Sequence, residues 1–219
     1  AHGSTEVSVR LGKLEDVGRS EGEDLGLRVF VGSRSASVST SDLSSAAMDA
    51  LVERAVAMAR EAPEDRWAGL APQDRLLHGA SPLLDLADAH ACSPEALRAA
   101  ALRAEDAARS VDGVSNSEGA GAGASESVWA LATSHGFVGG YATTGFSISA
   151  SVIAGEGGAM QRDYAFHSAR HRARLDAPEA IGQLAGERAV ARLGPGTLRS
   201  GAMPVVLDPR VGASLLGHL

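Results

Sequence analysis

The segment that constrains the fold most is GFSISASVIAGE, residues 145–156, in which apolar and polar side chains alternate from Phe146 to Val152. In an extended chain the apolar set points to one side and three serines point to the other. The inward set is Phe146, Ile148, Ala150 and Val152. This period of two predicts a strand with one buried face and one face in water. A glycine-rich turn at 155–158 then leads into AMQRDYAFH, so the two strands should form an antiparallel hairpin.

The first sixty residues show the same alternation in shorter segments. EVSVRL places Val7, Val9 and Leu11 on one face, and LGLRVFV (25–31) and ASVST also alternate. A further strand is expected over 14–20. Asp42 is a candidate helix cap. The apolar residues behind it have helical spacing up to Ala62 and are Leu43, Ala47, Leu51, Ala55 and Met58. Four strands and one covering helix predict an N-terminal α+β domain over residues 1–62.

Residues 63–93 are interrupted by prolines and glycines, which predicts an extended linker with a short helical turn near 83–89. Ser93 and Pro94 then open a helix as cap and first helical residue. The sequence SVWALATS predicts a strand. Asp176–Glu179 has capping-box spacing ahead of a helix that runs to Leu193. Residues 94–200 are therefore expected to form a middle α+β domain.

The last segment, VVLDPRVGASLLGHL, predicts a strand beginning at Met203, a turn at Asp208-Pro209 and the first turns of a helix. A strand and helix this apolar need a covering layer. We interpret 201–219 as the start of a truncated C-terminal domain. The expected fold class is α+β, with two antiparallel sheet-plus-helix units followed by the start of the truncated C-terminal domain.

Composition excludes several functional classes. The formal net charge of −7 argues against a general binder of nucleic acid or anionic membranes, which would need a basic face. The single cysteine excludes an internal disulfide framework and favours a reducing compartment. No apolar run approaches a membrane span, and no signal-peptide core is found at the N-terminus. We expect a cytoplasmic protein.

Four motifs have catalytic or ligand-binding counterparts. HSARH places His167 and His171 four apart, as in zinc proteases, but no activating glutamate lies between them and arginines surround them, so solvent-exposed histidines are expected. GAGAG at 119–123 lacks the Gly-Lys-Ser/Thr of a phosphate loop and predicts a flexible hairpin connection. Cys92 with His90 has no orienting third group.

His218, the fourth, is a lone histidine on an apolar helix, and zinc sites need three or four ligands. No catalytic, cofactor-binding or metal-binding residue is therefore predicted within 1–219.

Together, the segments EVSVRLGKLEDVGRSEGEDLGLRVFVGSRSASVSTSDLS, RDYAFHSAR, APEAIGQLAGERAVARLG and MPVVLDPRVGASLLGHL resemble the TldD/PmbA family across nearly the whole chain. Members are roughly twice this length, so the resemblance implies an N-terminal half. The TldD branch carries His-Glu-x-x-x-His on the helix after the last strand. Aligning the Leu215-Leu216 pair places Gly217 at the first histidine and His218 at the glutamate. The chain thus resembles the PmbA/TldE branch, which lacks the metal motif.

The resemblance implies a subunit of a cytoplasmic TldD–TldE type zinc metalloprotease that degrades or processes peptides. Its partners would be a TldD-type subunit, which carries the zinc, and unfolded or extended peptides; this chain would hold no cofactor. The alternatives are an independent metallopeptidase with a metal site beyond residue 219, and a non-proteolytic peptide-binding or regulatory module. Family members are also labelled "modulator of DNA gyrase". The acidic composition of this chain gives no physical support for direct DNA binding.

Overall fold

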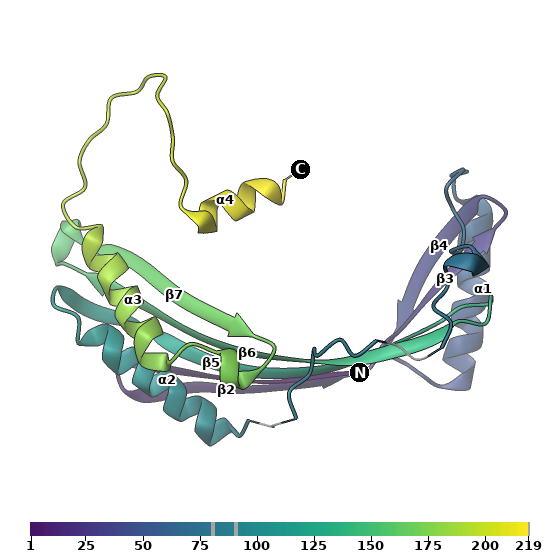
Figure 1. Ribbon diagram of the computed structural model, residues 1–219, viewed down its shortest axis with the longest axis horizontal. Coiled ribbons are helices and arrows are strands. Elements are labelled where there is room, and N and C mark those ends of the chain that lie inside the picture. Colours follow the sequence, from purple (N-terminus) through teal and green to yellow (C-terminus); the bar gives the residue numbers. More distant parts are fainter. Residues whose placement is uncertain (80–81, 90–91, 219) are drawn as a thin grey trace.

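The computed structural model describes residues 1–79, 82–89 and 92–218. A long curved sheet with two packed helices occupies one end of the molecule, and a small hairpin-and-helix unit lies at the other end (Figure 1). The strands are β1 (His2–Arg10), β2 (Lys13–Gly22), β3 (Leu25–Val31), β4 (Arg34–Thr40), β5 (Val114–Ala132), β6 (Val138–Ala154) and β7 (Gln161–Ala169). The helices are α1 (Ser45–Glu61), α2 (Pro94–Arg109), α3 (Pro178–Ala191) and α4 (Pro209–Leu216).

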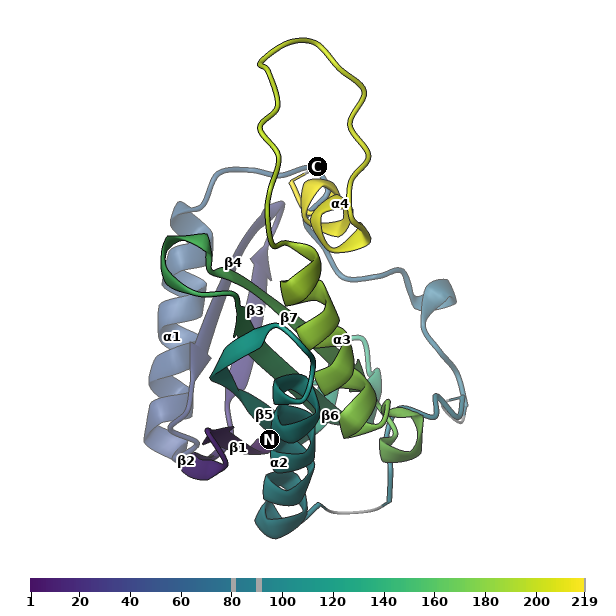
Figure 2. The ribbon, with the colours of Figure 1, turned by 90° about the vertical axis from the view of Figure 1, so that its left-hand side faces the viewer.

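The large sheet is antiparallel throughout, with the strand order β2-β1-β5-β6-β7. Helices α2 and α3 lie side by side on one of its faces (Figure 2) and enclose the core. Small residues let the two helices approach closely: a Cβ on Gly182 of α3 would lie 2.0 Å from the Ala104 carbonyl oxygen of α2. The buried strand residues include Val7, Val9 and the inward set of β6.

The α+β class is confirmed, but the expected grouping of the first four strands is wrong. β1 and β2 do not pair with β3 and β4; β1 pairs with β5, so that Val7 lies opposite Ala122. Alternation indicates which face of a strand is buried, but it does not identify the neighbouring strand. The structure puts the buried face of β1 under α2, where Val9 is fully buried.

A buried glutamate fixes the turn between β1 and β2. Glu105 of α2 is 1% exposed, and its carboxylate accepts the N–H groups of Leu11 (2.7 Å) and Gly12 (2.8 Å) and the Ser117 hydroxyl. Leu11, which was expected to face inward, lies in this turn with φ 51° and is half exposed. The turn requires left-handed backbone there, and the carboxylate satisfies both amides.

The small unit packs α1 on the β3–β4 hairpin. Helix α1 buries Leu51, Ala55 and Ala59, in place of the expected Met58. Its cap is Ser44, whose hydroxyl accepts the Ala47 N–H, and the expected cap Asp42 accepts the Ser44 N–H. That hydrogen bond stabilises the carboxylate and lowers the pKa of Asp42.

The linker is extended, as expected, but its helical turn is misplaced. Residues 82–88 contain no helix, and the one-turn 3₁₀ helix lies at Gln73–Arg75. The segment binds β6 instead: the Thr144 N–H donates to the Leu86 carbonyl (3.0 Å), and the Asp88 N–H donates to the Thr144 hydroxyl (2.9 Å). These bonds compete with helix formation. The domain boundaries proposed at 62/63 and 93/94 stay a prediction.

The Ser93 cap with Pro94 at the first helical position is confirmed, and so is the β6–β7 hairpin. The capping box at Asp176 is wrong, because the cap residue of α3 is Ala177, which makes no side-chain cap hydrogen bond. The Asp176 carboxylate lies instead 3.4 Å from the His167 ring.

The strand expected from Met203 does not form, although α4 does. Residues 202–208 have no regular structure, and Val206 is 97% exposed. No other described strand pairs with this segment, so its backbone lacks the partner that a strand needs. Asp208 caps α4 by accepting the Arg210 N–H at 2.9 Å. Within the described residues, no helix is long and apolar enough to cross a membrane.

Candidate functional site

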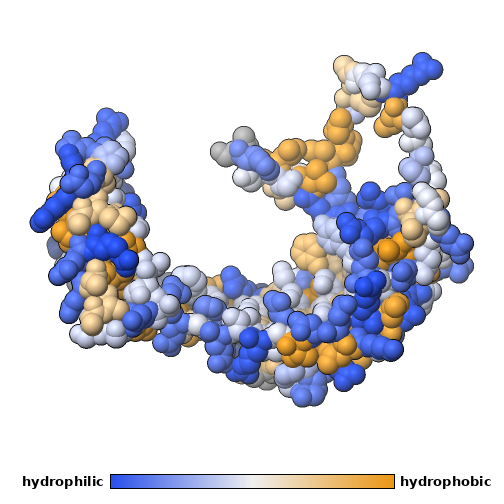
Figure 3. Space-filling view, turned by 180° about the vertical axis from the view of Figure 1, so that it is seen from behind, coloured by the Kyte–Doolittle hydropathy of each residue, from blue (hydrophilic) through white to orange (hydrophobic). Residues whose placement is uncertain are grey.

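The face of the large sheet opposite α2 and α3 is concave and open (Figure 3). GAGAG, expected to be a hairpin connection, lies inside β5 and forms part of this face. Its glycines Gly121 and Gly123 lie opposite serines of β6, whereas Ala120 and Ala122 face the core. The segment therefore has a period of two, which the sequence reading missed because both residue types are small.

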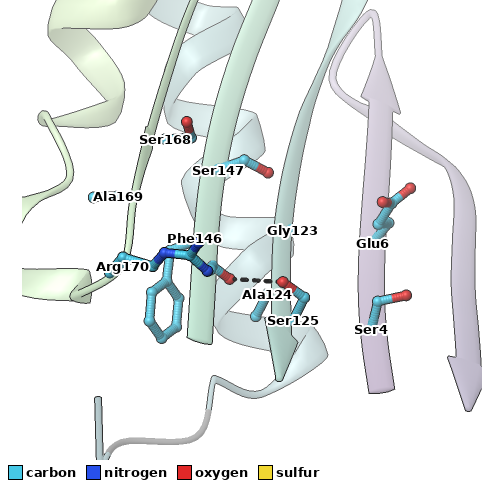
Figure 4. A pocket seen from close by; sticks show the side chains of 11 residues that line it. Ser4, Glu6, Gly123, Ala124, Ser125, Phe146, Ser147, Ser168, Ala169 and Arg170 are labelled. Atoms are coloured by element: carbon cyan, nitrogen blue, oxygen red, sulfur yellow. Dashed lines mark hydrogen bonds between the residues drawn. The ribbon is translucent and has the colours of Figure 1, made fainter. Parts of the chain in front are cut away.

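A hollow of about 380 Å³ lies over the middle of this open face (Figure 4). We call it the serine hollow. Its lining comes from four neighbouring strands and the residue after β7. The lining residues are Ser4, Glu6, Gly123, Ala124, Ser125, Gly145, Phe146, Ser147, Ser168, Ala169 and Arg170.

Cross-strand pairs of glycine and serine keep the floor of the serine hollow low. Gly123 lies opposite Ser147, and a Cβ on Gly123 would approach the Ser147 Oγ to 3.0 Å. Gly145 lies opposite Ser125, and its Cβ would approach the Ser125 Oγ to 2.9 Å. Larger residues at either glycine would fill the hollow and displace the hydroxyls.

Two charged residues flank the serine hollow on opposite sides, Glu6 on β1 and Arg170 just after β7 (Figure 4). Arg170 is fixed by Thr144: its Nη1 donates to the Thr144 carbonyl (3.3 Å), and the Thr144 hydroxyl donates to the Arg170 carbonyl (2.6 Å). Hydroxyls both donate and accept hydrogen bonds. The hydroxyls and the two flanking charges can therefore form hydrogen bonds with a polar ligand, such as the backbone of a peptide.

The two histidines of HSARH do not form a joint site. His167 lies on β7 and pairs with Asp176, and His171 follows β7 with its Nε2 3.1 Å from the Asp85 carboxylate. The side chain of His171 is only 19% exposed, so the expectation of solvent-exposed histidines is wrong for it. Each histidine contacts an aspartate from another segment of the chain, Asp176 for His167 and Asp85 for His171. The sequence analysis did not predict either contact.

Cys92 is half-buried and lines a smaller cavity of about 150 Å³ beside the first turns of α2 and α3. Its suggested companion, His90, lies outside the described residues. His218 is exposed after the end of α4, where its Nδ1 lies 2.7 Å from the Ser214 carbonyl, and Gly217 ends that helix. Among the described residues, neither Cys92 nor His218 forms part of a nucleophile-and-base pair.

The histidines and carboxylates that the structure describes are not arranged to hold a zinc ion. Among the described residues, no group of three or more histidine, cysteine, aspartate or glutamate side chains is placed to hold a metal. His167 and His171 each have one aspartate neighbour, and Arg174 also lies 3.7 Å from Asp85. A guanidinium at that carboxylate disfavours a second cation.

Helix α4 is held above the open face by an arginine (Figure 1). Arg210 donates to the Asp163 carboxylate on β7 (2.9 Å) and lies over the Tyr164 ring, and Arg192 approaches the same carboxylate at 3.3 Å. Burial favours the neutral form of Asp163. Hydrogen bonds from Arg210, the Tyr164 N–H and Arg192 outweigh it, so the pKa of Asp163 lies below its usual value.

Two family models match successive parts of the chain: the PmbA/TldA metallopeptidase domain 1 over residues 3–59, and the PmbA/TldA metallopeptidase central domain over residues 89–193. The chain is 36% identical over 214 residues to metalloprotease PmbA of Escherichia coli O157:H7. It is 33% identical over 213 residues to the PmbA homologue of Haemophilus influenzae. Both comparisons cover 97% of this chain and 47% of the relative, so the chain spans about half the length of these relatives.

Solved structures show the same fold. A proposed modulator of DNA gyrase from Bacteroides thetaiotaomicron superposes with a TM-score of 0.84 at 27% identity, over 99% of this chain and 49% of that chain. TldE from Thermococcus kodakarensis superposes with a TM-score of 0.68 at 19% identity, over 86% of this chain and 42% of that chain, which is a likeness of fold alone. With two domain models of one family matched in order, the chain belongs to the PmbA/TldD metallopeptidase family.

Proposed function

We propose that this chain is part of a PmbA/TldE-like subunit of a TldD–TldE type cytoplasmic zinc metalloprotease that degrades or processes peptides. The observation that carries the proposal is the 36% identity to metalloprotease PmbA over 97% of the chain. The proposed partnership with a TldD-type subunit rests on membership of the PmbA/TldD family.

In this proposal the subunit contributes a peptide-binding surface. The serine hollow offers hydroxyls on a low glycine floor, which can bond the backbone of an extended peptide with little regard for its side chains. That indifference suits a protease that acts on unfolded substrates. A zinc ion in the partner would supply an activated water. This chain's residues would hold and orient the peptide.

An independent metallopeptidase is the second candidate, because the relatives themselves are named metalloproteases. Its metal ligands would lie outside the residues described here. The two candidates predict different behaviour of the full-length protein by itself.

Cleavage of an unstructured peptide separates them. The full-length protein, its TldD-type partner and the mixture are each assayed with and without a chelator. We expect chelator-sensitive cleavage by the mixture and none by this protein alone. Chelator-sensitive cleavage by this protein alone, at the rate of the mixture, would refute the non-catalytic assignment.

A further inference from the structure

The serine hollow has charged residues of opposite sign at its two sides and small polar residues between them (Figure 4). Glu6 lies in one cross-strand row with Gly123 and Ser147. Arg170 follows β7 on the opposite side, and its side chain extends across β6 toward Ser125 (Figure 4). All five residues lie on the open face of the sheet. The hollow therefore runs across the strands from an acidic end to a basic end.

The Glu6 carboxylate is accessible because its neighbours are small. Glycines lie opposite Glu6 on both adjacent strands, Gly18 on β2 and Gly123 on β5. Neither glycine has a side chain that could cover the carboxylate. Glu6 is exposed and has no hydrogen-bond or ion-pair partner among the described residues. Its carboxylate can therefore accept hydrogen bonds from an ammonium group of a ligand.

Arg170 is held in position without being neutralised. Its Nη1 donates to the Thr144 carbonyl at 3.3 Å, and no carboxylate pairs with it among the described residues. A guanidinium has five N–H donors, so most of those of Arg170 remain available to a ligand. Arginine binds a carboxylate through two parallel hydrogen bonds. The basic end of the serine hollow therefore suits a carboxylate.

The size and span of the serine hollow indicate a short ligand. Its volume of about 380 Å³ is near the lower end of the range for small-molecule pockets, about 300–1,000 Å³. Glu6 and Arg170 are three strand spacings apart, or about 14 Å between their backbones. The Arg170 side chain shortens this gap, and two or three extended residues, at roughly 3.3–3.6 Å each, can span the rest. We propose that the serine hollow binds a di- or tripeptide, with its amino terminus at Glu6 and its carboxyl terminus at Arg170.

A short free peptide matches both ends of the serine hollow at once. At neutral pH it carries an ammonium group at one end and a carboxylate at the other. The serine hydroxyls between these ends can donate to or accept from its peptide bonds. An internal segment of a long polypeptide has an uncharged backbone and would leave Glu6 and Arg170 unpaired. The inference rests on the proposed function in taking a peptide as the ligand, and it adds that the hollow recognises short cleavage products by their two termini.

An NMR titration of the isotope-labelled 219-residue chain with trialanine tests this proposal. N-acetyl-trialanine and trialanine amide each lack one terminal charge and should bind about three- to tenfold more weakly. Glu6→Gln should weaken binding of trialanine by a similar factor but leave binding of the N-acetyl peptide unchanged. Arg170→Gln should weaken binding of trialanine but leave binding of the amide unchanged. Glu53→Gln and Arg54→Gln, at exposed positions on α1, are the matched controls and should bind trialanine as wild type does.

Loss of affinity that follows this pairing of variant with peptide end would support the proposal. It would be overturned if the residues lining the hollow showed no saturable shift up to about 20 mM trialanine. Equal affinity for trialanine and both capped peptides, or equal weakening by the α1 controls, would also overturn it. The titration involves neither a partner subunit nor cleavage. A negative titration therefore leaves the proposed function standing, since that function is tested by the cleavage assay of the mixture.

Discussion

Replacing Glu105 should destabilise the large sheet more than any other single polar substitution in α2. The Glu105→Ala change leaves the Leu11 and Gly12 amides and the fully buried Ser117 hydroxyl without their acceptor. A buried donor left unsatisfied costs about 1–3 kcal/mol. The two amides lie in a turn that water can reach, so they take the lower end of this range. The sum is a loss of about 3–5 kcal/mol.

Glu105→Gln should cost less, about 1–3 kcal/mol, because one carbonyl oxygen remains while the new NH₂ group faces a donor. Urea denaturation followed by circular dichroism measures both variants, and unchanged m-values would show that the unfolded reference is the same. Asp106→Ala, at the exposed neighbouring position, is the control and should stay within about 0.5 kcal/mol. A Glu105→Ala loss no larger than that of the control would refute the account of this turn.

Three further predictions concern the open face and the C-terminal segment. Arg210→Ala should release α4, which would be measured as faster proteolysis of that segment at pH 7. The pKa of Asp163 is lower in the folded protein than in the unfolded chain. The stabilising contact between Arg210 and Asp163 is therefore fully present above about pH 4 and is lost as the pH falls through the folded-state pKa. Gly145→Val should fill the serine hollow and lower peptide cleavage by the assembled protease, since its side chain displaces the Ser125 hydroxyl. Deleting residues 203–219 should leave the rest folded, with an unchanged cooperative thermal transition, because Arg210 is the main attachment of this segment.

Each of these predictions has a contradicting result. Arg199→Ala, which replaces another exposed arginine, is the control for Arg210→Ala. Equal rates of proteolysis of the two variants would show that Arg210 does not hold α4 in place. Gly26→Val, on β3 with open space around its Cβ, is the control for Gly145→Val, and equal cleavage by the two would exclude the hollow from binding. Loss of the cooperative transition on deletion would show that the C-terminal segment belongs to the core.

Local signals in the sequence predicted local structure well. Ser93-Pro94 marks the start of α2 because a hydroxyl cap and a proline act within one turn, and the alternation over Phe146–Val152 gives the buried face of β6 directly. The prediction of Asp176 as a helix cap was wrong because its capping-box spacing is only a local signal. Its actual partner, His167, lies on another element.

What the sequence did not predict depends on contacts between distant segments. β1 pairs with β5, and Glu105 accepts hydrogen bonds from the β1–β2 turn. Neither contact produces a repeating pattern in the sequence from which it could be predicted. The serine hollow was missed because GAGAG contains no large residue, so its alternation carries no hydrophobic signal. Only the register of β5 against β6 shows that its glycines face serines.

We propose that this protein is the subunit of the protease that holds no metal. The most direct test of this proposal is the zinc content of the full-length protein and of a TldD-type partner, purified separately, dialysed and then mixed. We predict about one zinc per pair, all of it brought by the partner, with cleavage activity following that zinc. Stoichiometric zinc in this protein before mixing, with peptide cleavage that disappears when that zinc is removed, would contradict the account.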